Sequence, residues 1–298
     1  SYGIGETYTL MVPGSFGGGS GEPVGKDSES YKKLRIKSAP LYWGNQPFTS
    51  GPVYFGVIIV FLFVLGLFVV KGPERWWLLG ATLLALILSL GKNLMGVNEF
   101  LFNNLPLYNK FRTPSMSLVI ANVSMVMMAI LALKAIFDKD NAISTKRLNV
   151  ALYVSTGITC GFMLLVLALS GGFSFSGVSD EQMAMSYGDS WSQLERIFVA
   201  DRKALFVSDT WRSVVLVLLS AATIFVAIRL KDKKYNVVFA SSVAILSVLM
   251  LFDLWNVDRR YLNDDSYVSQ KDIQLKPSED DKKIDMYAEQ FGDKDYRV

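Results

Sequence analysis

Histidine is missing from this chain of 298 residues, and cysteine occurs once, at position 160. Without histidine the chain supplies no Ser-His-Asp triad, no imidazole acid or base and no histidine metal ligand. A single cysteine cannot form a disulfide within the chain, so Cys160 is expected to pack as a small apolar side chain. Charged residues make up only 19% of the chain, and the formal net charge of +3 is too small to indicate a nucleic-acid partner.

Hydrophobic residues, in contrast, make up 51% of the chain. A helix that crosses about 30 Å of hydrocarbon needs roughly 20 mainly apolar residues, and its backbone groups must be satisfied within the helix. We therefore predict an all-α polytopic membrane protein with about six transmembrane helices, one of which, at 76–90, is short. The six apolar segments are Pro52–Val70, Trp76–Leu90, Leu118–Phe137, Leu148–Ser170, Val214–Leu230 and Val237–Val257.

Lysine and arginine gather in the short links between these segments, as do Lys71 and Arg75 after the first. Because cytoplasmic loops carry such an excess, the short links are expected on the cytoplasmic side, which places both ends of the chain outside. The predicted organisation is an extracytoplasmic loop segment at 1–51, a membrane domain at 52–257 with long external loops at 91–117 and 171–213, and the start of an extracytoplasmic C-terminal region at 258–298.

The segments outside the predicted spans carry a few local signals. Six glycines between positions 14 and 25 predict a flexible loop, and Ser179 begins a capping-box pattern that predicts a short helix. A separate amphipathic helix is expected from about Ser190 to Val207, with its charged residues in a solvated face of local ion pairs. The chain opens at Ser1 without a signal peptide and closes inside a polar segment, so it is expected to be a fragment of a longer membrane protein.

Two cations and two aromatic residues lie close together in the sequence YNKFR at 108–112, just before a predicted span. A planar guanidinium can bind a lipid phosphate through two hydrogen bonds, which makes Arg112 a candidate phosphate contact. The alternative is that Lys110 and Arg112 are interface cations whose apolar stems lie along the membrane. No acidic or basic residue lies at the centre of a predicted span, which argues against the core of an ion-coupled transporter.

Four peptides together resemble the bacterial YfhO family of membrane proteins: LYWGNQPFTSGPVYFG at 41–56, YNKFRTPSM at 108–116, SDTWRS at 208–213 and DLWNVDRRYL at 253–262. The resemblance covers nearly all of the chain, which would be the C-terminal part of that family's membrane region. It implies a C-type glycosyltransferase architecture in the bacterial cytoplasmic membrane. Such proteins take a sugar from a polyprenyl-phosphate donor on the outer face and pass it to a cell-envelope glycan or lipid.

The resemblance also implies which residues carry the reaction. The expected catalytic base is a carboxylate in an external loop that matches no part of this chain, so the catalytic residue is unknown here. Arg112 is the first candidate for binding the donor phosphate, which needs cations as it departs. No cofactor is expected, and a divalent metal is compatible with the chemistry, although no carboxylate cluster has a ligand spacing typical of a metal site. The other candidate substrate-binding residues are the cations Lys110, Lys92 and Arg202 and the aromatic residues Tyr42 and Trp43, which would stack on a sugar or on the lipid head region.

Two other functions fit the same sequence. A lipid-carrier transporter or flippase would move the carrier across the bilayer without transferring sugar, and would be expected to show buried charges in spans outside this chain. A non-catalytic scaffold of envelope assembly would lack the carboxylate in the first external loop. Under either alternative the partners still include membrane lipid, and a nucleic-acid partner is still not indicated.

Overall fold

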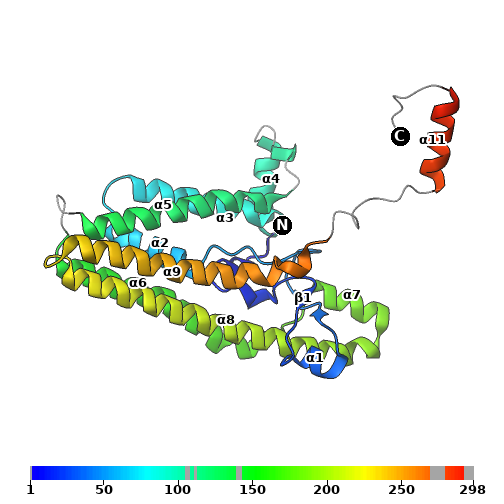
Figure 1. Ribbon diagram of the computed structural model, residues 1–298, viewed down its shortest axis with the longest axis horizontal. Coiled ribbons are helices and arrows are strands. Elements are labelled where there is room, and N and C mark those ends of the chain that lie inside the picture. The colour runs from blue at the N-terminus through cyan, green and yellow to red at the C-terminus, as the bar shows by residue number, and fades with distance from the viewer. Residues whose placement is uncertain (1, 105–107, 111–112, 139–142, 269–278, 292–298) are drawn as a thin grey trace. The chain divides into compact units, whose positions relative to one another are not determined.

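The computed structural model describes residues 2–104, 108–110, 113–138, 143–268 and 279–291. It divides into two units, Ser1–Asp258 and Arg259–Val298. Within the described residues the chain is mainly helical, and its only sheet is a two-stranded antiparallel pair (Figure 1). The longer elements are β1 Glu22–Pro23, α1 Glu29–Leu34, β2 Ser38–Ala39, α2 Val57–Val69, α3 Glu74–Leu90, α4 Met95–Asn104, α5 Leu118–Phe137, α6 Thr145–Leu169, α7 Val178–Tyr187, α8 Asp189–Leu230, α9 Tyr235–Tyr261 and α11 Glu279–Phe291.

Five helical stretches are long and apolar enough to cross a membrane. They are Glu74–Asn104, Pro114–Phe137, Thr145–Gly172, Asp189–Leu230 and Tyr235–Tyr261. Each presents large apolar side chains on its surface, such as Val119 on α5 and Leu165 on α6. Exposed apolar faces of this extent are typical of helices that contact lipid. The coarse prediction of a multi-span helical membrane protein is thus supported.

The first predicted span differs from the expectation. Only 13 residues of the segment at 52–70 form α2, about 20 Å of helix, while the residues before Gly56 belong to an extended segment. The second predicted span also differs. The segment expected to be short, at 76–90, starts earlier, at Glu74, and continues through a 3-10 turn into α4. Periodicity alone does not reveal where a helix ends when the apolar run continues past it.

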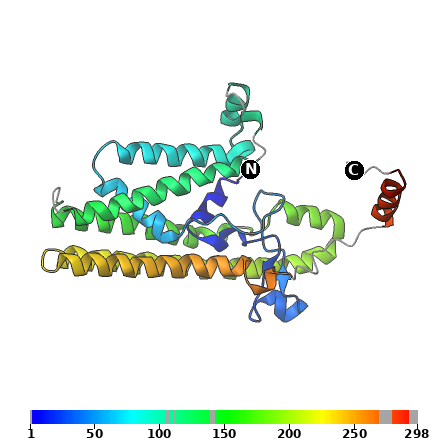
Figure 2. The same cartoon turned by 45° about the horizontal axis from the view of Figure 1, so that its top comes forward.

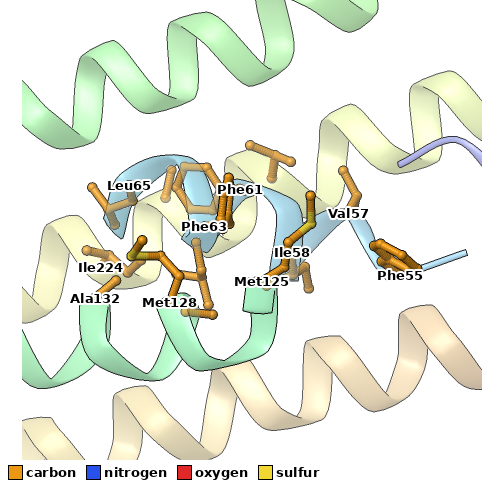
Figure 3. Close-up of a cluster of buried hydrophobic side chains, with 14 of the residues drawn as sticks. Phe55, Val57, Ile58, Phe61, Phe63, Leu65, Met125, Met128, Ala132 and Ile224 are labelled. Carbon is orange, nitrogen blue, oxygen red and sulfur yellow. The ribbon is translucent and has the colours of Figure 1, made fainter. Parts of the chain in front are cut away.

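The core of the first unit forms around α2 (Figure 3). Because α2 is apolar on all sides, it is stable only where other helices surround it, and it packs against α5, α6 and α8. Phe61 and Leu62 are completely buried, and Met128 of α5 lies against α2 without exposure. The shortest apolar helix is therefore the most enclosed one, and the longer helices around it carry the exposed apolar faces.

The links between consecutive helices alternate between two ends of the first unit (Figures 1 and 2). The links from α2 to α3, from α5 to α6 and from α8 to α9 lie at one end, here called the basic end because it carries residues such as Lys71, Lys134 and Lys231. Residues 2–56, here called the N-terminal cap, lie toward the other end together with α7. The structure thus gathers the three short basic links on one side of the bundle.

The helix α8 joins two elements that the sequence predicts separately. It runs without a break for 42 residues, about 63 Å, and so contains both the amphipathic helix expected at 190–207 and the span expected at 214–230. Its length is about twice the thickness of a bilayer core. The part beyond the span therefore projects from the bundle, and this projecting part holds the N-terminal cap.

The second unit contains one long element, α11, in the sequence position where Ser278 and Gly292 bound an expected helix. Its first turn carries Glu279, Asp280 and Asp281, which interact favourably with the positive end of the helix dipole. Its side chains with described exposure are exposed or only partly buried. Nothing in this unit supplies a core of its own among the described residues.

The contact between α2 and α5 generates a test of the core. A Cβ atom at Gly66 would lie 2.5 Å from Cγ and 3.1 Å from the backbone oxygen of Met128. Gly66→Ala should therefore lower the free energy of unfolding by about 1–3 kcal/mol, measured by thermal unfolding in detergent. The control is Gly80→Ala in α3, where no atom lies within 4 Å and the better helix propensity of Ala should make the change neutral or favourable. Equal unfolding temperatures for the two variants would contradict the packing.

Candidate functional site

The candidate site lies where the N-terminal cap meets the projecting part of α8. The cap contains two 3-10 helices, η1 at Gly5–Leu10 and η2 at Pro13–Phe16, followed by the β1–α1–β2 segment. The glycines that predict a flexible loop are instead mostly buried, and Gly17 adopts a left-handed conformation with φ of 81°. A Cβ atom there would lie 1.8 Å from the Leu41 carbonyl oxygen, so this close backbone approach requires glycine.

Arg202 of α8 is the principal attachment of the cap. Its Nη1 and Nη2 atoms donate to Asp180 of α7 at 2.8 and 3.0 Å, and its side chain is 1% exposed. The remaining donors bind the backbone oxygens of Pro40, Leu41 and Phe175, each at 2.8 Å. All five N–H groups of the guanidinium are thus used. One side chain holds the cap, the start of α7 and the loop before it against α8.

In the loop before α7, Phe175 has a strained backbone conformation and a side chain that packs between two aromatic rings. Phe175 has φ of 52°, a left-handed conformation that costs about 1–2 kcal/mol for a residue with a side chain. Its carbonyl oxygen accepts a hydrogen bond from Arg202, and its ring lies between Trp43, at 5.4 Å, and Phe206, at 5.8 Å between ring centroids. These contacts offset the strain and bring three aromatic rings together at the base of the cap.

Asp201, next to Arg202 on α8, binds a second part of the cap. Its two carboxylate oxygens accept hydrogen bonds from the backbone N–H groups of Glu29 and Ser30, at 2.7 and 2.9 Å. These groups begin α1, whose N-cap is Ser28. A carboxylate at a helix N-terminus is stabilised by the unsatisfied N–H groups and by the helix dipole. Consecutive residues of α8 therefore hold two different segments of the cap.

Inside the cap, Glu6 organises a small polar network. Its carboxylate accepts hydrogen bonds from the Tyr42 hydroxyl and from the Gly3 backbone N–H. Burial raises the pKa of the Tyr42 phenol well above its usual range, and the neighbouring Glu6 carboxylate raises it further. Burial also raises the pKa of Tyr8 to about 12, although the nearby Thr210 side chain limits the rise. The cap therefore holds these phenols in the neutral form.

A third attachment joins α9 to the start of α2. Asp253 of α9 is fully buried, and its carboxylate accepts hydrogen bonds from the Tyr54 hydroxyl at 2.7 and 2.8 Å and from the Val57 backbone N–H at 3.2 Å. Arg212 of α8 lies 3.3 Å from the same carboxylate, with its guanidinium 5.8 Å from the centre of the Tyr54 ring. The cluster fixes the point at which the cap becomes α2.

A cavity of about 610 Å³, here called the aromatic cavity, lies between the cap, α6 and α8. This volume is in the range of small-molecule binding sites, which are mostly apolar with a few polar groups. Phe162 of α6 is about half exposed, so the cavity opens beside the apolar face of that helix. The lining residues are Ile4, Gly5, Thr7, Tyr8, Met11, Ser15, Phe16, Trp43, Phe162, Val166, Phe173, Ser174 and Phe206.

Three polar atoms in this lining have no hydrogen-bond partner among the described residues. They are the Tyr8 hydroxyl oxygen, Oγ of Ser15 and Nε1 of Trp43, and all three are buried from water. Leaving a buried polar group unpaired costs about 1–3 kcal/mol, so such atoms are uncommon unless a ligand or a water molecule pairs with them. The indole of Trp43 is itself held by stacking on Phe16 at 4.3 Å. The cavity thus combines apolar walls with three groups that can donate a hydrogen bond.

The substrate-binding residues predicted from the sequence fall in different places. Arg202 is buried with all its N–H groups occupied, which leaves none for a phosphate in this conformation. Tyr42 is also buried, with its hydroxyl on Glu6, whereas Trp43 lies in the wall of the aromatic cavity. Lys92 and Lys110 are exposed on short 3-10 turns away from that lining. Arg112 lies outside the described residues, and its phosphate role stays a prediction.

The sequence interpretation missed the buried acidic residues. Asp180 and Asp201 lie among other polar residues in the sequence, so spacing alone places them in solvated segments, and Asp253 stands near the end of a predicted span with no partner indicated. The N-cap of the helix at 178–187 is Gly177, two residues before the expected Ser179, and Asp180 accepts a hydrogen bond from the Gly177 N–H at 2.8 Å. The peptides SDTWRS and DLWNVDRRYL, which carry the family resemblance, contain Arg212 and Asp253 and were the available signal.

Comparison of the chain with protein-family models, with curated proteins and with solved structures finds no match.

The buried ion pair generates the first test of the site. Arg202→Ala leaves Asp180 buried without its charged partner and should lower the free energy of unfolding by about 3–5 kcal/mol. Limited proteolysis should show faster cleavage within residues 20–44, because the attachment to α8 is lost. Lys203→Ala, an exposed neighbour on the same helix, is the matched control and should change neither quantity. If residues 20–44 of the Arg202→Ala variant resist the protease as well as those of the unsubstituted protein, Arg202 does not hold the cap to α8.

Alkaline pH tests the burial of the phenols. Above pH 10 the unfolded chain loses the Tyr8 proton, while the folded chain retains it until about pH 12, so folding stability should fall across this window. The slope for one group is about 1.4 kcal/mol per pH unit. Tyr8→Phe should make the decline of thermal stability between pH 10 and 12 shallower. An unchanged slope in the variant would show that Tyr8 is solvated in the folded protein.

Proposed function

We propose that this chain is the part of an integral membrane glycosyltransferase that binds a polyprenyl-phosphate-linked sugar on the outer face of the bacterial cytoplasmic membrane. The sugar would pass to a glycan or lipid of the cell envelope. In this proposal the N-terminal cap and α7 are extracytoplasmic, and α2 completes a six-segment membrane domain. The observation that supports the proposal is the aromatic cavity, which lies at the border between the cap and the apolar helices.

The walls of the cavity suit an isoprenoid chain. Such a chain is apolar and unsaturated, so it packs against rings such as those of Phe16, Phe162 and Phe206 with both apolar burial and contact with π faces. Burial contributes about 25 cal/mol for each Å² of apolar surface removed from water. Because the half-exposed Phe162 lies at the mouth, a lipid could enter from the membrane without crossing water.

The polar atoms of the cavity suit the head of the same molecule. Nε1 of Trp43 and Oγ of Ser15 supply hydrogen-bond donors for a phosphate or a sugar hydroxyl, and the Trp43 ring can stack on a sugar. The described lining contains no carboxylate. Inverting transfer needs a carboxylate that deprotonates the acceptor hydroxyl, so in this proposal the base comes from another loop of the protein.

A pair of neighbouring substitutions on α6 tests the proposal. Val166 lines the cavity, and Val166→Phe adds a ring to it, which should weaken binding of radiolabelled polyprenyl phosphate to the purified protein about tenfold, or about 1.4 kcal/mol. Leu165 is 56% exposed on the adjacent face, and Leu165→Phe should leave binding unchanged. Equal binding by both variants would remove the cavity from the proposal.

Transfer and translocation assays then separate the candidate functions. Membranes containing the protein should transfer labelled sugar from a polyprenyl-phosphate donor, and Val166→Phe should reduce the rate in proportion to its loss of binding. Carrier movement across vesicles without sugar transfer would instead identify a flippase. Binding with neither activity would identify a non-catalytic scaffold.

A further inference from the structure

A second cavity, of about 390 Å³, lies at the basic end of the first unit. It is formed where α2 ends, α3 begins and α5 ends, at the opposite end of the bundle from the N-terminal cap (Figures 1 and 2). Its walls include the apolar side chains of Val69, Leu131 and Ile143. This headgroup cavity, as we name it, is separate from the aromatic cavity and does not depend on the proposed function.

Four charged residues line the headgroup cavity, two of each sign. Lys71 and Lys134 are exposed, and neither forms an ion pair within the described residues. Glu74 and Asp138 provide two carboxylates on the same lining. Gly72, with φ of 105°, allows the Glu74 carboxylate to fold back over the link, because a Cβ at 72 would lie 2.3 Å from Glu74 Oε2. The lining thus carries groups of both signs and no net charge.

The position of the cavity points to a lipid as its occupant. Three apolar helices end here, so its floor belongs to the hydrocarbon side of a bilayer and its charged rim to the headgroup side. Trp76 and Trp77 are 61% and 57% exposed in the first turn of α3, and exposed Trp is typical of the level of lipid headgroups. A soluble anion would use the rim and leave the apolar floor unused.

We propose that the headgroup cavity binds the zwitterionic headgroup of an aminophospholipid, such as phosphatidylethanolamine. The lipid phosphate would lie between the ammonium groups of Lys71 and Lys134, and the lipid ammonium would bind the carboxylates of Glu74 and Asp138. The first acyl carbons would then contact Val69 and the other apolar side chains of the floor. An anionic lipid without an ammonium would face the two carboxylates, and a choline headgroup has no N–H to donate to them.

Lipid titration of the full chain in detergent, followed by native mass spectrometry, tests the assignment. Phosphatidylethanolamine should bind about fivefold more tightly than phosphatidylglycerol or phosphatidylcholine with the same acyl chains, since exposed charge pairs contribute up to about 1 kcal/mol. Equal binding of the three lipids would overturn the proposal. Tighter binding of phosphatidylglycerol would also overturn it, because it would indicate simple attraction to the basic end.

Substitutions separate the two halves of the headgroup. Lys71→Ala combined with Lys134→Ala should reduce binding of phosphatidylethanolamine about fivefold, because the phosphate contacts are lost. Glu74→Gln should abolish the preference over phosphatidylglycerol without weakening phosphatidylglycerol itself. Lys146→Ala, an exposed cation at the same end but outside the lining, should change nothing. A full lipid preference in Glu74→Gln would overturn the assignment, and circular dichroism shows whether each variant is folded.

Discussion

The hydrogen bonds of Arg202 are the constraint on which the rest of the cap depends. A buried guanidinium is tolerated only when a carboxylate and further acceptors satisfy it, and here Asp180 and three backbone oxygens do so. Those oxygens come from segments separated by more than 130 residues along the chain. None of these segments has a large apolar core of its own. Arg202 holds them where they meet, and the Asp201 hydrogen bonds and the packing of Leu41 against α8 complete the cover over the projecting part of that helix.

The aromatic cavity follows from that arrangement. Phe206 lies one helical turn after Arg202 on α8, so fixing the cap through Arg202 also sets how far Trp43 lies from Phe206. Both rings line the cavity, and Phe175 packs against each of them. At the far end of the bundle, Lys231 Nζ and the Tyr235 hydroxyl donate hydrogen bonds to the backbone oxygens of Ile136 and Phe137, at 2.9 and 2.8 Å, and so hold the link between α8 and α9 against the end of α5. The two ends therefore differ in kind: one is a folded cap over an apolar cavity, and the other is a charged rim at the ends of apolar helices.

Much of the fold could be predicted from the sequence, because long apolar runs in a chain with few charges have few other solutions. The ends of the helices could not be predicted in the same way. The apolar run at 52–70 begins before α2 does, and the charged stretch at 190–213 belongs to the same helix as the span that follows it. The candidate site was harder to predict than the fold. Whether Arg202 binds a ligand or its own protein depends on where Asp180 and distant backbone oxygens lie, and no local spacing encodes that. Trp43, which the sequence suggests because aromatic residues are typical of a membrane border, lies in the wall of the aromatic cavity, and its role in binding stays a prediction.

Photocrosslinking with a polyprenyl phosphate that carries a diazirine in its isoprenoid chain tests the central claim most directly. The chain is purified in lipid, irradiated with the probe and digested, and the modified residues are identified by mass spectrometry. The account predicts labelling of residues 4–16 of the cap and of residues 162–174 at the end of α6, suppressed by an excess of unlabelled polyprenyl phosphate. Labelling confined to the exposed faces of α3 and α9, without competition, would contradict it.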